Sequence, residues 1–153
     1  MLYWYCDFEG YNCGRDDFVV KEISILSSDG TQCFTYRVTS PINYIYFPDD
    51  KTFRYQFQRH NLAWEDGDYS FRHTMNDIMA KVRGYAVFCK GDQKQRFLMN
   101  YLPYVAQLDM VPSIKRLNSC LSERCEYQHC KFCARKKVYE LKHYIDSNKI
   151  ILN

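Results

Sequence analysis

The strand-like segments in the first forty residues are the feature that most constrains how this chain can fold. Val, Ile, Tyr, Phe and Thr dominate residues 2–8, 17–28 and 31–40, and these residue types are enriched in β-strands. The turn sequence Ser28-Asp29-Gly30 separates the second segment from the third. We therefore expect these two segments to pair as an antiparallel hairpin.

Within the second segment, the two-residue period of a strand predicts which side chains share a face. One face would carry Val20, Glu22, Ser24 and Leu26, and the other Val19, Ile23 and Ile25. Glu22 would then lie among apolar neighbours. A carboxylate in such a place is costly unless it is paired or binds a cation.

Helix and strand patterns alternate after residue 70. Ser70 can cap a helix over residues 71–81, another helix follows Gly91-Asp92, one opens at Pro112-Ser113, and a last one covers about 131–145. Strands are expected at 85–89 and 104–110, and residues 41–68 read as a loop with a short helix near 54–60. The order β-β-β-α-β-α-β-α predicts an α/β domain with a mixed five-stranded sheet flanked by helices, compatible with an RNase H-like sheet.

Length and composition set the domain count and the cellular setting. The chain has 153 residues, of which 46% are apolar and 25% charged, which indicates a single globular domain over residues 1–153. The start lacks a basic n-region and no stretch has 18 apolar residues in a row, so we expect an intracellular protein without a membrane partner. A domain of this size needs no disulfides, so its eight cysteines are first expected to be packing residues, metal ligands or nucleophiles.

Asp7 and Glu9 form a carboxylate pair at the end of the first strand. Two residues apart on a strand, they share a face and could hold Mg²⁺. This D-x-E pattern, followed by the hairpin, resembles the first motif of the DEDD (DnaQ-like) 3′-5′ exonucleases. The resemblance implies a two-metal site for phosphodiester cleavage.

The same resemblance implies two further carboxylates, which this chain lacks. Alignment on Phe97-Leu98 places Lys94 where the second would stand, and Ala134 falls five residues beyond His129, where the third would stand. We therefore expect a catalytically degenerate sheet that retains Asp7 and Glu9. The alternative is an active nuclease that uses Mg²⁺ or Mn²⁺ through these two acids, or one that cleaves through other residues.

Four thiols and an imidazole cluster near the C-terminus, in the pattern Cys120-x4-Cys125-x3-His129-Cys130-x2-Cys133. Thiolate and imidazole are the ligands that Zn²⁺ prefers, and the spacings are those of structural sites. The cluster predicts a zinc site and offers five ligands for four positions.

The chain also resembles Maelstrom domains, which are RNase H-like and DnaQ-related, have lost the exonuclease carboxylates and carry a Glu-Cys-His-Cys zinc site. The matching features are the strand Lys21-Glu22-Ile23-Ser24-Ile25, the Ser-Asp-Gly turn, Pro41 after the third strand, Cys125 with His129, and Cys133 opening an Arg/Lys-rich helix. The resemblance implies structural zinc bound by Glu22, Cys125, His129 and Cys133. Cys120 remains an alternative to Glu22, and Cys130 is a further alternative ligand.

Basic residues gather in the C-terminal third, with eight against three acidic residues between positions 113 and 143. A phosphate-facing surface is one interpretation and a solvated helix face is another. On the first interpretation, the candidate nucleic-acid-binding residues are Lys131, Arg135, Lys136, Lys137 and Lys142. The Maelstrom resemblance implies RNA handling, and therefore a single-stranded RNA partner, with DNA possible and a link to small-RNA or transposon control.

A third hypothesis is a protein-interaction scaffold with an exposed aromatic patch. The segment around Tyr44, Tyr46 and Phe47 is where this hypothesis places the patch. His60 and His73 have no evident partners in the sequence and are expected to be surface or loop residues.

Overall fold

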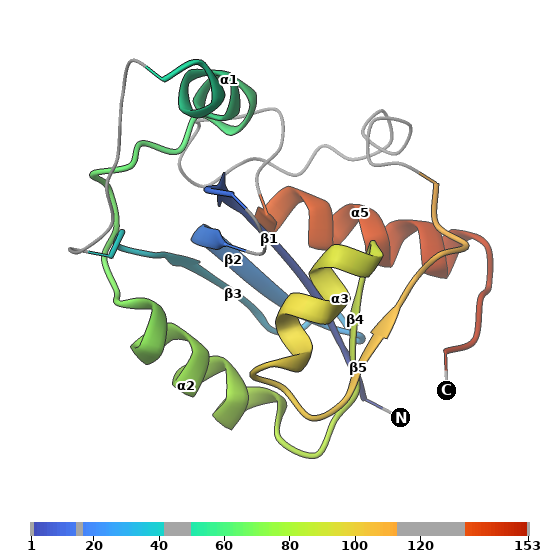
Figure 1. The fold of residues 1–153 in the computed structure, drawn as a ribbon. Coiled ribbons are helices and arrows are strands. Elements are labelled where there is room, and N and C mark those ends of the chain that lie inside the picture. Colours follow the sequence, from blue (N-terminus) through green and yellow to red (C-terminus); the bar gives the residue numbers. More distant parts are fainter. Residues whose placement is uncertain (1, 15–16, 42–49, 113–133, 153) are drawn as a thin grey trace.

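The computed structural model describes residues 2–14, 17–41, 50–112 and 134–152 (Figure 1). The elements in chain order are β1 (Trp4–Asn12), β2 (Phe18–Ser27), β3 (Cys33–Arg37), α1 (Lys51–His60), α2 (Phe71–Val82), β4 (Val87–Cys89), α3 (Asp92–Met99), β5 (Val105–Gln107) and α5 (Ala134–Ser147). The helix expected from residue 113, and residues 131–133 of the last helix, lie outside the described residues.

The strands form one mixed sheet in the order β3-β2-β1-β4-β5. β1 pairs antiparallel with β2 and β2 antiparallel with β3, whereas β1 with β4 and β4 with β5 are parallel. The predicted hairpin and the predicted α/β class with a mixed five-stranded sheet are confirmed.

The Ser28-Asp29-Gly30 turn closes the hairpin, and the side chain of Asp29 provides hydrogen-bond acceptors for the residues around it. The Asp29 carboxylate accepts hydrogen bonds from the Ser27 hydroxyl and from both the amide and the hydroxyl of Thr31. These donors lower the pKa of Asp29 to about 2. Gly30 has φ of 78°, a conformation that glycine adopts without steric cost.

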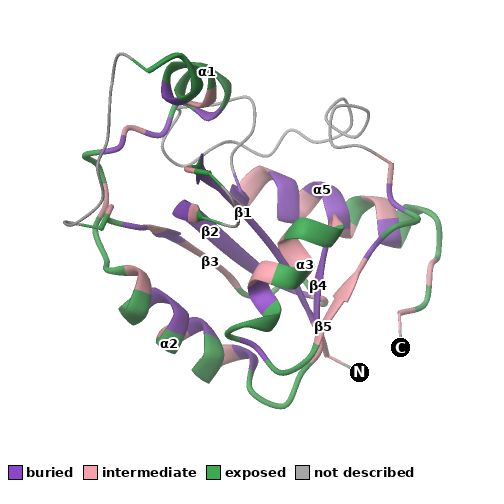
Figure 2. Ribbon diagram, in the orientation of Figure 1, coloured by how far each residue is buried: buried purple, intermediate pink, exposed green. Residues whose placement is uncertain are grey.

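Helices cover both faces of the sheet. α2 and α3 pack on one face through Met75, Ile78, Val82 and Leu98, and α5 packs on the other through Val138, Leu141 and Ile145. Figure 2 shows the consequence, with the central strands buried and the outer sides of the helices exposed. Ser70 caps α2 as predicted, since its hydroxyl accepts a hydrogen bond from the amide of His73 at 3.1 Å.

A β-bulge changes the side-chain alternation expected for β2. Glu9 pairs with Glu22 but Gly10 pairs with Val20, so Lys21 is the extra residue. Val20 therefore joins Ile23 and Ile25 in the α2/α3 core, and the predicted grouping of Val20 with Glu22 is wrong. A side chain at Gly10 would meet the Val19 carbonyl oxygen at 2.0 Å, so only glycine fits there.

α1 is fastened to the carboxyl end of β1 by His60. The ring Nδ1 accepts from the Leu62 amide at 3.0 Å, which leaves Nε2–H to donate to the Gly10 carbonyl at 2.9 Å. His60 is buried, so its expected position at the surface is wrong, whereas His73 is exposed as expected. The error has a long-range cause, because the partner of His60 lies fifty residues earlier in the chain.

Candidate functional site

Asp7 and Glu9 lie side by side on β1 and are both buried. Lys94 of α3 places its Nζ 2.5 Å from Asp7 Oδ1 and 3.8 Å from Glu9 Oε1. Lys137 of α5 is in direct contact with Glu9 Oε1 and lies 3.8 Å from Asp7 Oδ2. Each carboxylate therefore has both ammonium groups as neighbours, and we call these four side chains the acid–lysine cluster.

The two lysines differ in their access to solvent. The side chain of Lys137 is 5% exposed, whereas that of Lys94 is 25% exposed and lies 5.3 Å above the Phe8 ring. Lys94 also lies in the first turn of α3, where the helix dipole disfavours a cation. Asp7 and Glu9 compensate for this unfavourable position.

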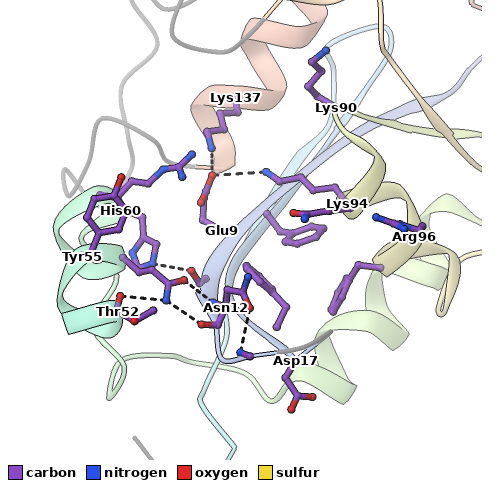
Figure 3. A pocket seen from close by; sticks show the side chains of 18 of the residues that line it. Glu9, Asn12, Asp17, Thr52, Tyr55, His60, Lys90, Lys94, Arg96 and Lys137 are labelled. Carbon is purple, nitrogen blue, oxygen red and sulfur yellow. Dashed lines mark hydrogen bonds and ion pairs between the residues drawn. The ribbon is translucent and has the colours of Figure 1, made fainter. Parts of the chain in front are cut away.

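An open cleft of about 1530 Å³ begins at the acid–lysine cluster. α1 forms one side and α3 the other, and the carboxyl end of β1 lies between them (Figure 3). β1 pairs antiparallel with β2 on one side and parallel with β4 on the other, so the pairing of the sheet changes at β1. The cleft thus occupies the edge where open α/β sheets bind their ligands, at the carboxyl ends of strands beside a switch in topology.

The described residues that line the cleft give it a positive charge. Among them are five cationic side chains against two carboxylates, those of Glu9 and Asp17. The cationic side chains are Arg59, Lys90, Lys94, Arg96 and Lys137. In Figure 3, Lys94 and Lys137 converge on Glu9, whereas Lys90 and Arg96 lie apart from it.

The cleft also carries an exposed aromatic side chain. Tyr55 of α1 is 67% exposed and lines the cleft opposite α3. Phe18 and Phe97 line it as well, and both are partly buried against the α2/α3 core. A positively charged cleft with accessible rings has the two components that bind a phosphate backbone and stacked bases.

Glu22 lies on β2 directly opposite Glu9 and is fully buried. Its Oε1 accepts a hydrogen bond from the Ala134 amide at 2.8 Å, and its Oε2 is 3.9 Å from Arg37 Nε. Ala134 follows Cys133 directly in the sequence. Glu22, a predicted zinc ligand, therefore contacts the residue that directly follows Cys133, another predicted ligand.

The other predicted zinc ligands, Cys125, His129 and Cys133, and the alternatives Cys120 and Cys130, lie outside the described residues. Within residues 2–14, 17–41, 50–112 and 134–152, no group of three or more His, Cys, Asp or Glu side chains could hold a metal ion. A zinc site thus stays a prediction.

The basic residues predicted in the last helix are not gathered on an open face. Lys137 is buried against Glu9, Lys142 pairs with Asp146, and Arg135 and Lys136 are half-buried. The guanidinium of Arg135 contacts the Tyr139 ring and the Cys33 sulfur. Lys131 lies outside the described residues.

Cys6 and Cys89 have the packing role, one of the three that the sequence left open for its cysteines. Cys6 and Cys89 are buried in the α2/α3 core. Burial raises the pKa of Cys6 well above its ordinary value and that of Cys89 to about 12. Both thiols are therefore protonated at neutral pH, the inert state of a cysteine.

Glu140 is a buried carboxylate that the sequence analysis did not single out. It lies on α5, one turn beyond Lys137, and its two carboxylate oxygens have no hydrogen-bond partner within the described part of the chain. Burial raises its pKa, and the negative charge of Asp7 acts in the same direction.

Sequence reasoning missed the cleft residues Arg59, Lys90, Arg96 and Tyr55. A partial signal was present, since Lys90 directly follows the strand expected at residues 85–89, which the structure places parallel to the strand that carries Asp7. The sides of a cleft, however, depend on where α1 and α3 sit, and sequence periodicity gives no such placement.

Neither a scan against protein-family models nor a search of curated proteins finds a match to this chain. Over the described residues, the structure contains no helix with the length and apolar character needed to cross a membrane.

Proposed function

We propose that this chain is a catalytically degenerate RNase H-like domain that binds single-stranded nucleic acid, with RNA as the first candidate. The acid–lysine cluster carries the proposal. A carboxylate pair that served metal-dependent cleavage would need cations around it, and here the ammonium groups of Lys94 and Lys137 are those cations. The pair is neutralised while the cleft beside it remains positively charged.

The sheet supports the proposed relationship. A three-stranded antiparallel unit continued by parallel crossovers is the arrangement that the sequence analysis associates with an RNase H-like fold. Lys94 lies beside Asp7, and alignment with DnaQ-like exonucleases puts an acid at its position. The substitution is thus consistent with an ancestral metal site in which lysine has replaced a ligand.

Size supports a polymer as the occupant of the cleft. Pockets for small molecules measure about 300 to 1,000 Å³, and this cleft measures about 1530 Å³. In the proposed complex, Lys90 and Arg96 contact phosphates and Tyr55 stacks on a base. Lys90 and Arg96 lie outside the basic C-terminal third of the sequence.

Structural zinc belongs to the same proposal. Glu22 fits a ligand role because its carboxyl group is buried and accepts a hydrogen bond from the residue after Cys133. With Cys125, His129 and Cys133 it would make a closed four-ligand site, which fastens β2 to the last helix and leaves no position for an activated water. This ligand set, like the likeness to Maelstrom domains, is part of the proposal.

A titration of labelled single-stranded RNA at increasing salt concentrations tests the binding function. Affinity should fall as salt rises, and Lys90→Met and Arg96→Met should each reduce the slope of log affinity against log salt by about 0.7, the value for one lost phosphate contact. Arg72→Met is the matched control, because Arg72 is exposed on α2 and does not line the cleft. Absence of binding to any RNA or DNA strand at low salt would overturn the proposal.

A further inference from the structure

We infer that Lys94 and Lys137 act as fixed cations in place of divalent metal ions, so that the cleft binds the phosphate backbone directly and without Mg²⁺ or Mn²⁺. This inference rests on the proposed function for its ligand. The arrangement of charges that carries it is independent of that ligand.

In the acid–lysine cluster, one ammonium group from α3 and one from α5 neutralise the two carboxylates of β1. The Asp7 and Glu9 carboxylates share one face of β1, and each has two ammonium neighbours within 4 Å. Without the lysines, two adjacent carboxylates so little exposed would repel each other and any phosphate. Such a pair either takes up a proton or binds a cation.

Lys94 is the member of the cluster that a ligand can reach. Its side chain is 25% exposed and lines the cleft, whereas that of Lys137 is 5% exposed. An ammonium group carries three donors, and among the described residues that of Lys94 contacts the carboxylates of Asp7 and Glu9 and lies over the Phe8 ring. A phosphate oxygen in the cleft can therefore approach Lys94 from the solvent side while the carboxylates hold the ammonium in place.

Replacing Lys94 should convert this cluster into a cation site. Lys94→Met leaves one ammonium for two carboxylates, with open access from the cleft. Lys94→Gln removes the charge but keeps a hydrogen-bond donor for Asp7, so it covers the case in which the methionine variant is poorly folded. Lys90→Met is the control, because it removes a cleft cation that has no ion pair with Asp7 or Glu9 among the described residues.

Mn²⁺ binding, followed by electron paramagnetic resonance on protein with one equivalent of zinc, tests the inference without nucleic acid. Wild type and Lys90→Met should bind no Mn²⁺ at the cluster, whereas both Lys94 variants should gain one site with at least a roughly tenfold higher affinity. Mn²⁺ binding by the wild type that Asp7→Asn removes, or no gain in either folded Lys94 variant, would overturn it.

Binding of single-stranded RNA by the zinc-loaded protein gives the second measurement, made in buffer without Mg²⁺ or Mn²⁺ and in Mn²⁺ at matched ionic strength. Wild-type affinity should be the same in both, and Lys94→Met should lose roughly tenfold without Mn²⁺ and recover with it. A wild type that needs Mn²⁺ to bind RNA would overturn the inference. A wild type that binds no strand at all would overturn the proposed function, and the Mn²⁺ measurement on the free protein would still decide the inference.

Discussion

At the scale of single residues, the molecule depends on buried charges with specific partners. Lys21 is an example that the sequence analysis did not single out as functional. The bulge directs its ammonium between β2 and the segment after α1, where it donates to Ser40 Oγ and to the carbonyl oxygens of Trp64 and Asp66. Burial, together with the charge of Arg37, lowers its pKa to about 8.

This shift predicts a rise in stability at alkaline pH. Between the folded pKa of about 8 and the ordinary value of 10.5, the unfolded chain binds a proton that the folded chain has lost, so unfolding becomes less favourable as pH rises. Relative to Lys21→Met, the wild-type free energy of unfolding should increase by about 2 to 3 kcal/mol across this window.

Urea unfolding at a series of pH values from 7 to 10.5 measures the effect. Lys51→Met is the control, because Lys51 is exposed at the start of α1 and should leave the slope unchanged. If the free energy of unfolding changed with pH in the same way for the wild type and for Lys21→Met, the assignment of the effect to Lys21 would be contradicted.

Local sequence signals predicted the residues whose partners are close in the chain. Ser70 caps α2 three residues before its donor, and Asp29 bonds to residues two positions away on each side. His60, Lys94 and Lys137 could not be placed in this way. Their long-range partners, Gly10, Asp7 and Glu9, lie 50 or more residues away, and only the assembled sheet brings them together.

At the scale of elements, a hydrogen bond and an ion pair join the start of α5 to the two central antiparallel strands. The Ala134 amide bonds to Glu22 of β2, and Lys137 pairs with Glu9 of β1. Because Glu9 and Glu22 are cross-strand neighbours, both contacts lie over adjacent strands. The proposed zinc site would add a further link between the helix and the sheet at the same place.

Metal analysis by mass spectrometry tests whether the protein binds zinc at the proposed site. Native protein should carry one zinc and Cys133→Ser none. Glu22→Gln should also lose zinc, since the amide can still accept from the Ala134 amide but provides no anionic ligand. Glu140→Gln is the matched control, as it neutralises another buried carboxylate of the same region and should retain the metal.

The outcomes separate the alternatives that the sequence left open. Zinc retained in Glu22→Gln would favour Cys120 as the fourth ligand. A native protein free of zinc would contradict the metal assignment altogether.

At the scale of the whole molecule, the class of the sheet was predictable from the sequence and the cleft was not. Strand and helix periodicities indicated a hairpin followed by crossovers, and this pattern alone limits the sheet to a few arrangements. The basic character of residues 113–143 indicated a surface on the last helix. Lys137 and Lys142 of that helix instead pair with carboxylates and Arg135 contacts a ring, while cationic side chains of α1 and of residues 90–96 line the cleft.

In the proposed function, the neutralised carboxylate pair leaves a domain that binds a single strand and does not cut it. Incubation of end-labelled single-stranded RNA and DNA with the protein in Mg²⁺ or Mn²⁺ tests it most directly, with binding recorded in the same samples. We predict a bound and intact strand in every case. Cleavage by the wild type would contradict this proposal: loss of cleavage in Asp7→Ala would show that Asp7 and Glu9 still serve a metal-dependent reaction, and cleavage that persists in Asp7→Ala would show a nuclease that uses other residues.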